Sequence, residues 1–403
     1  MELANIIETV KNIFSESPKQ KLMEQGCKYS ENEEHEKAIE CYEKVLEIDP
    51  NNADAHLCLG TSLEDLNRFE EAEGEYKKAI EINPGFAEAH LGLGTSLQRL
   101  NRFEESEREY RKAIKINSGF AEAHLGLGLL FVDLNRFEEA EMEYRKAIKI
   151  NPGFAEAHLG LGDLLHHDLK RFEEAKKEYR KAIAINPDFE ESHLGLGVLL
   201  EDLNRFEEAE KEYRKAIDIN PDSAEAHLGF GNLLQNLNRY EEAEKEYREM
   251  LRINPDDACA KCKIATIYKN RDNNYKLSLK VYNEALENYR DCGYLNLKIG
   301  KTLLEINETE NQEKYLDYFK KAYKLLKKDL GVMENPGDNA NLYGCLGITS
   351  THLKKNDKAR EYFEKAIKYA KECDKLYSDD LDKYISREEF INECKNRLSG
   401  MLR

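Results

Sequence analysis

Residues Ala87–Gly94 read AEAHLGLG, and the same eight letters return at Ala121–Gly128 and Ala155–Gly162. Close variants begin at Ala53, Glu190 and Ala224. Successive copies begin 34 residues apart, except that 35 residues separate Ala155 from Glu190. A period of this length indicates a chain built from repeated supersecondary units.

Each unit contains two apolar stripes with the spacing of amphipathic helices. The first stripe consists of His90, Leu93, Gly94, Leu97 and Leu100, and the second of Phe103, Ser106, Tyr110, Ala113 and Ile114. Between the stripes, Asn101 tolerates the left-handed backbone that often ends a helix. Asn-Pro pairs such as 83–84 and 151–152 close most units, because the residue before Pro is pushed out of the helical region. One unit is therefore expected to be a pair of antiparallel helices, and neighbouring pairs must stack to bury both stripes.

This pattern resembles the tetratricopeptide-repeat (TPR) family. The family's large, Leu-Gly, apolar, small, aromatic and small positions are matched by His90, Leu93, Gly94, Leu97, Ser106, Tyr110 and Ala113. The chain departs from the family where His90, Asn101 and Ser118 replace its usual Trp, Gly and Pro. The resemblance implies an all-α, right-handed superhelical solenoid of stacked antiparallel helix pairs with helical caps at both ends. About ten repeats cover most of the chain.

The expected organisation has four parts. They are an N-terminal capping helix in 1–18, regular repeats in 19–257, divergent repeats in 258–373 with a loop near 328–339, and C-terminal capping helices in 374–403. Small and aromatic positions persist in the divergent part, as at Gly300, Phe319 and Ala322. The apolar stripes of both caps are expected to cover the ends of the array; a partner-binding or self-associating helix is the alternative.

The net charge and the cysteine content limit the classes of function that the sequence supports. The net charge is −18; residues 258–403 carry 28 Lys/Arg against 23 Asp/Glu, and the preceding residues carry 33 against 56. Such an acidic chain is a poor match for nucleic acid, whose affinity depends on clustered cations. No apolar run approaches the ~18 residues of a membrane span, and the first residues lack the pattern of a signal peptide. We therefore expect a cytoplasmic protein with no membrane or nucleic-acid partner, whose nine Cys are reduced thiols.

The resemblance also implies that the first helix of each unit lines a concave face that contacts a partner. The residues expected there are Leu91, Thr95, Gln98, Arg99, Leu125, Leu129, Val132, Asp133, Leu159, Asp163, His166, His167, Leu194, Glu201, Asp202, Leu228, Asn232, Gln235 and Asn236. Units 87–120 and 121–154 differ at eight positions, and five of these are consecutive, Thr95–Arg99 against Leu129–Asp133. Either specialisation for a ligand or drift at a tolerant helix end explains that cluster.

An apolar floor with acidic rims is expected along this face. Leu91, Leu125, Leu159, Leu194 and Leu228 would form the floor, and Glu88, Glu122, Glu156, Glu191 and Glu225 the rim. This combination suits an extended or helical partner segment that is both basic and apolar. The alternative is that these Leu pack only between repeats. The Lys, Asn and Arg of the family's carboxylate clamp are replaced by Leu, Gly and Glu through most of the array.

The main hypothesis is thus a non-enzymatic protein-interaction scaffold without cofactor or metal. His56, His90, His124, His158, His193 and His227 share one framework position and are interpreted as structural. The first alternative is a metal- or redox-dependent sensor or enzyme accessory using Cys259 and Cys262, with Cys292 nearby, although a second Cys or His pair for zinc is missing. The second is a self-assembling array joined through its end repeats, with the acidic front attracting the basic rear.

Overall fold

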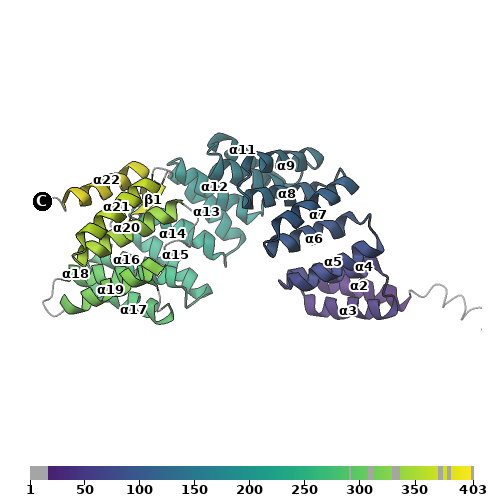
Figure 1. The fold of residues 1–403 in the computed structure, drawn as a ribbon, viewed down its shortest axis with the longest axis horizontal. Helices are drawn as coiled ribbons and strands as arrows, with labels where there is room; N and C mark the ends of the chain where they lie inside the picture. The colour runs from purple at the N-terminus through teal and green to yellow at the C-terminus, as the bar shows by residue number, and fades with distance from the viewer. Residues whose placement is uncertain are drawn as a thin grey trace, which may run out of the picture. The chain divides into compact units, whose positions relative to one another are not determined.

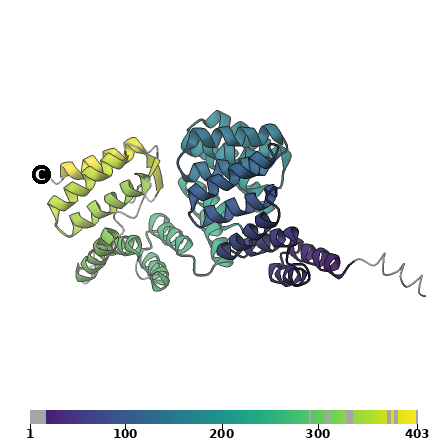
Figure 2. The same cartoon turned by 45° about the vertical axis from the view of Figure 1, so that its right-hand side comes forward.

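The computed structural model describes residues 17–289, 292–306, 312–328, 336–370, 375–378 and 383–400. The expected N-terminal cap falls almost entirely outside this part of the chain. The chain divides between Leu199 and Leu200 into two compact units, each a stack of helix pairs (Figures 1 and 2). The prediction of an all-α array of stacked helix pairs is confirmed.

The first unit contains five helix pairs and the start of a sixth. The pairs are α2 (Pro18–Glu31) with α3 (His35–Ile48), α4 (Ala53–Asp65) with α5 (Phe69–Ile82), α6 (Ala87–Arg99) with α7 (Phe103–Ile116), α8 (Ala121–Asp133) with α9 (Phe137–Ile150), and α10 (Ala155–Asp163), continued by the π-helical turn η1 (Leu164–Asp168), with α11 (Phe172–Ile185). Helix α12 (Glu190–Asp202) crosses the division between the units.

The second unit continues the pattern and ends with a small hairpin. Its helices are α13 (Phe206–Ile219), α14 (Ala224–Asn236), α15 (Tyr240–Ile253), α16 (Ala258–Asp272), α17 (Tyr275–Asn288), α18 (Gly293–Glu305), α19 (Gln312–Lys328), α20 (Pro336–His352), α21 (Asn356–Ala370) and α22 (Arg387–Gly400). Helix α21 packs between α20 and α22 (Figure 1).

Two details differ from the sequence-based expectations. The segment expected to contain only capping helices includes an antiparallel hairpin, β1 (Lys375–Ser378) paired with β2 (Lys383–Ser386), before α22. The segment expected to be a loop near 328–339 is helical from Pro336, because Pro is favoured in the first turn, where its missing N–H costs nothing.

The turns within the pairs follow the expected chemistry. Asn101 has φ 57°, and Asn67, Asn135, Asn204 and Asn238 lie in the same left-handed region. The Arg102 N–H donates to Leu97 O at 2.9 Å, which closes the end of α6 in the manner of a Schellman motif. Between pairs, Asn83 precedes Pro84 and has φ −128°. Asn117 precedes Ser118 instead of a proline and has nearly the same φ, −127°. Proline is therefore not required for this turn.

A buried tyrosine joins each pair to the next. The ring of Tyr110 lies between Gly94 of its own pair and Gly126 of the following pair, and a Cβ built on Gly126 would be 2.7 Å from the ring. Tyr76 lies in the same way between Gly60 and Gly92. These glycines therefore allow helices to approach the ring closely, which explains the repeated Gly-x-Gly of the first helices.

Candidate functional site

The first helices of the pairs contact one another along one side of each stack. Successive first helices α4, α6, α8 and α10 touch, as do α18 and α20, and these contacts are more extensive than those between successive second helices. Elements that approach more closely lie on the inner side of a curved stack. The predicted partner-contacting residues lie on these first helices or, for His166 and His167, on η1.

Most polar positions among them are hydrogen-bonded to the framework tyrosines. The Tyr110 hydroxyl donates to Gln98 Oε1 at 3.0 Å, and the Tyr179 hydroxyl donates to Asp163 Oδ1 at 2.7 Å. Further pairs are Tyr213 with Glu201 at 3.1 Å, Tyr247 with Asn232 at 3.0 Å and with Gln235 at 3.2 Å, and Tyr110 with Thr95 at 3.3 Å. These side chains thus help to hold each pair together.

Two hydrogen bonds connect predicted site residues of neighbouring repeats. Gln98 Nε2 donates to Asp133 Oδ2 at 2.6 Å within the first unit. Asn236 Nδ2 donates to Glu201 Oε1 at 3.1 Å within the second unit. The structure therefore brings these members of the predicted set together across 35 residues of sequence.

The repeat 121–154 departs from this pattern. Of the eight equivalent buried tyrosines at 42, 76, 110, 144, 179, 213, 247 and 282, only Tyr144 has a hydroxyl that forms no hydrogen bond with a described residue. The reason is local, since Leu129 and Val132 occupy the positions at which Thr95 and Gln98 bind Tyr110. Leu129 is 45% exposed, so an apolar side chain faces solvent at this position.

Three carboxylates act electrostatically on the same hydroxyl. Burial raises the pKa of Tyr144 well above its ordinary value, and the negative charges of Asp163, Asp133 and Asp168 raise it further. The half-buried Leu125 lies one turn before Leu129 on α8, and the half-buried Leu159 occupies the same position of the unit on α10. The surface around Leu129 therefore combines apolar side chains with negative potential.

Three predicted contact residues are buried and are removed from the candidate surface. His166 is 1% exposed because the π-helical turn directs its ring against Phe172 and Tyr179, with centroids 5.9 and 6.3 Å away. Leu194 and Gln235 are each 8% exposed. The extra residue of this repeat does form the expected bulge, but of the two histidines only His167 is exposed there.

The remaining predicted residues keep some exposure. Arg99, Leu129, Asp133 and His167 are exposed, while Leu91, Thr95, Gln98, Leu125, Val132, Leu159, Asp163, Glu201, Asp202, Leu228, Asn232 and Asn236 are half-buried. The rim residues Glu88, Glu122, Glu156, Glu191 and Glu225 are all exposed.

The framework histidines have a structural role. His124 Nδ1 lies 2.6 Å from Glu143 Oε2, and Lys146 Nζ donates to the other oxygen of Glu143 at 2.7 Å. Burial would raise the pKa of Glu143, but the hydrogen bonds from His124 and Lys146 outweigh it and leave this pKa lowered. The same contact joins His56 to Glu75, His90 to Glu109, His158 to Glu178 and His227 to Glu246, at 2.6 to 2.7 Å.

Sequence reasoning missed a second link between repeats. Arg102 donates to Glu105 one turn later and to Glu73 of the preceding repeat, both at 2.7 Å. The equivalent links between repeats join Arg136 to Glu107, Arg171 to Glu141 and Arg239 to Glu210. The signal was present in the sequence, because an Arg at the start of a second helix recurs 29 or 30 residues after a Glu.

The cysteines proposed for metal or redox chemistry lie around one cavity of about 280 Å³. Cys259, Cys262 and Cys292 line it together with Lys263 and Lys298. Burial, followed by the nearby Cys259 and Cys292, raises the pKa of Cys262 to about 12, which keeps that thiol protonated and unreactive at neutral pH. Among the described residues, no three His, Cys, Asp or Glu side chains are arranged to hold a metal ion.

A related observation concerns membranes. None of the helices in the described part of the chain combines the length and the apolar character required to span a bilayer.

Comparison with known families gives matches along most of the chain. Models described as tetratricopeptide repeat match residues 53–86, 340–373 and overlapping segments from 91 to 258, and one described as TPR repeat matches residues 26–66. No curated protein matches the sequence.

Several solved structures are similar to parts of the chain. A structure reported for the functional characterization of Pseudomonas aeruginosa pilF is 22% identical, with a TM-score of 0.47, and the match covers 54% of this chain and 97% of that one. A tetratricopeptide repeat protein from Parabacteroides merdae is 17% identical, with a TM-score of 0.48 and coverage of 62% and 99%. MamA is 30% identical, with a TM-score of 0.35 and coverage of 40% and 94%.

Proposed function

Because this chain belongs to the tetratricopeptide-repeat family, whose repeats commonly bind partner proteins, we propose that it is a protein-interaction scaffold. The first-helix side around Leu129 binds a basic and apolar segment of a partner. The family is generally non-catalytic, and no catalytic role is proposed for this surface.

The observation that carries the proposal is the repeat 121–154. Elsewhere the tyrosine hydroxyl is satisfied by a polar side chain of the first helix, whereas here Leu129 is exposed and no described residue hydrogen-bonds the Tyr144 hydroxyl. An exposed apolar side chain next to an unused hydrogen-bonding group offers both contact area and a polar anchor.

Charge supports the basic character of the partner. Asp133, Asp163 and Asp168 act on the Tyr144 hydroxyl, so a Lys or Arg of the bound segment would meet negative potential there. Leu125, Leu129 and Leu159 would take its apolar side chains. The sequence of the bound segment is therefore expected to interleave apolar residues with Lys or Arg.

The test uses two substitutions of exposed apolar residues in one repeat. Leu129→Asp places a charge on the proposed surface, and Met142→Asp, on the second helix where Met is 53% exposed, is the matched control. Affinity capture from the native host should recover a partner with the wild-type chain and with Met142→Asp, but lose it with Leu129→Asp. Equal recovery with all three chains of equal helicity would refute the surface assignment.

A further inference from the structure

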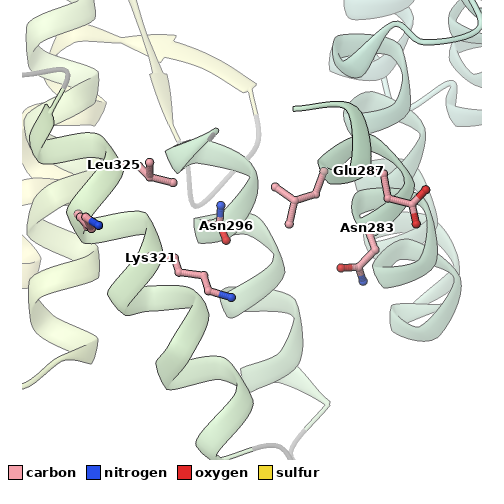
Figure 3. Close-up of a pocket in the computed structure, with 7 residues that line it drawn as sticks. Asn283, Glu287, Asn296, Lys321 and Leu325 are labelled. Carbon is pink, nitrogen blue, oxygen red and sulfur yellow. The ribbon is translucent and has the colours of Figure 1, made fainter. Parts of the chain in front are cut away.

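A pocket of about 500 Å³ lies between α17, α18 and α19, and none of its lining residues is among those assigned to partner binding above. It is lined by Asn283, Leu286, Glu287, Asn296, Lys321, Lys324 and Leu325. Figure 3 shows Asn296 of α18 between α17, which carries Asn283 and Glu287, and α19, which carries Lys321 and Leu325.

The pocket exists because this repeat lacks the polar pair of the regular repeats. Asn296 stands four residues before Gly300, as His124 stands four residues before Gly128, and Tyr318 replaces the glutamate that binds the histidine. The Tyr318 hydroxyl turns instead to Asn283 Oδ1 at 3.3 Å. Among the described residues of α19, no carboxylate therefore takes the place of that glutamate beside Asn296.

Asn296 is left with an unused acceptor. Its side chain is 1% exposed, and Nδ2 donates to Cys292 O at 2.8 Å, which fixes the orientation of the amide. No described residue donates to Oδ1. A buried carbonyl oxygen without a partner costs about 1–3 kcal/mol, so a ligand that brings an N–H or O–H donor to this atom is favoured.

The α19 side of the pocket is positively charged, whereas Glu287 is the acidic lining residue on the α17 side. Five lysines of α19 are exposed, at positions 320, 321, 324, 327 and 328, and two of them, Lys321 and Lys324, line the pocket. Lys321 pairs with Asp317 at 2.9 Å, while Lys324 forms no ion pair with a described residue. The apolar side chains Leu286 of α17 and Leu325 of α19 also line the pocket.

We propose that this pocket binds a short acidic, apolar segment of a partner protein. A main-chain N–H of the segment donates to Asn296 Oδ1, an apolar side chain fits between Leu286 and Leu325, and acidic side chains pair with Lys321 and Lys324. The phosphates of a nucleic acid would meet the lysines, but they carry no donor for Asn296 Oδ1 at neutral pH. The segment has the opposite charge to the one bound around Leu129, so the two surfaces take different partners.

The experiment measures binding of a fluorescent, blocked peptide ELDLE to the full chain by anisotropy. Saturable binding with a Kd below about 1 mM and no binding of KLKLK are expected. The variant Lys321→Glu/Lys324→Glu should weaken binding by about tenfold or more, because two favourable charge contacts become repulsive. The matched variant Lys320→Glu/Lys327→Glu changes the same charge on the same helix outside the pocket, and it should weaken binding by less than about threefold.

A second variant tests the pocket itself. Asn296→His/Tyr318→Glu rebuilds the histidine–glutamate pair of the regular repeats and should abolish binding without lowering Tm. The proposal would be overturned if ELDLE showed no saturable binding, if the two lysine variants lost equal affinity, or if the rebuilt pair bound with wild-type affinity. Competition by oligouridylate as effective as unlabelled ELDLE would overturn it in favour of a phosphate-binding surface.

Discussion

At the scale of single residues, the framework histidines His56 and His227 each bridge two acceptors. His227 Nδ1 lies 2.7 Å from Glu246 Oε2, and Nε2 lies 3.1 Å from Pro221 O. Both neighbours accept hydrogen bonds, so only the doubly protonated ring satisfies both contacts. The hydrogen bond with Glu246 raises the pKa of His227, and it outweighs the lowering effect of burial.

This bridge predicts a pH-dependent stability. Because the folded pKa of His227 is raised, its contribution is complete below the unfolded pKa of about 6.5 and is lost as pH rises through the folded pKa. His227→Gln should lower the free energy of unfolding by about 1–2 kcal/mol at pH 6 and by less at pH 9. Urea unfolding at the two pH values measures this, and a larger loss at pH 9 would contradict the charged bridge.

Substitution of glycine by alanine is expected to have opposite effects on stability at two positions. Gly126→Ala places a Cβ 2.7 Å from the Tyr110 ring, and Gly94 confines the ring on its other side. This substitution should lower the free energy of unfolding by about 1–3 kcal/mol. Gly74→Ala, in helix α5, has no atom within 4 Å of the new Cβ and should stabilise the chain by about 0.5–1 kcal/mol. Thermal unfolding of both variants compares them; a stabilising Gly126→Ala would show that the ring can move.

At the scale of elements, the repeat 155–189 shows how an extra residue is accommodated. The additional residue widens the end of the first helix into the π-helical turn η1. The following left-handed position is taken by Lys170, φ 54°, where the regular repeats have Asn. The bulge therefore leaves the second helix α11 in the same register as the other second helices.

The left-handed turn predicts a reciprocal pair of substitutions. Lys170→Asn should stabilise the chain by up to about 1 kcal/mol, because Asn tolerates this backbone better than Lys does. Asn101→Lys, at φ 57° in a regular repeat, should destabilise it by a similar amount. Tm shifts of the same sign in the two variants would rule out backbone preference as the cause.

At the scale of the whole molecule, links between side chains are distributed unevenly along the chain. From residue 53 to 257, histidine–glutamate contacts join the two helices of a repeat, and arginine–glutamate contacts join successive repeats. After residue 258 the histidine position holds Lys261 and then Asn296. In the described part of the chain, the regular repeats therefore have a histidine–glutamate contact that the pairs α16–α17 and α18–α19 lack.

Hydrogen exchange should reflect this distribution. We expect the slowest-exchanging amides to lie within residues 53–257 and faster exchange in the helices after 258, since stability in repeat arrays is set by local and nearest-neighbour terms. Exchange followed by mass spectrometry on the full chain measures both regions at once. Slower exchange after residue 258 would contradict this ranking.

The sequence by itself determined the helix pairs, their period, the asparagine turns and the structural role of the histidines. These features depend on interactions within one or two turns of helix, which the 34-residue repetition displays several times over. The lack of a polar partner for Tyr144 could also have been inferred, because Leu129 and Val132 replace Thr95 and Gln98 at known positions of the unit.

Only the tertiary structure decided which side chains meet across repeats and which are buried. It paired Arg102 with Glu73 and Gln98 with Asp133, turned His166 inward, and left Asn296 Oδ1 buried with no donor among the described residues. Such contacts depend on how far each pair is shifted and rotated against the next. That geometry is set by the packing of whole helices, so a change of one residue in a helix, as at η1, redirects side chains that the repeat pattern would place on the surface.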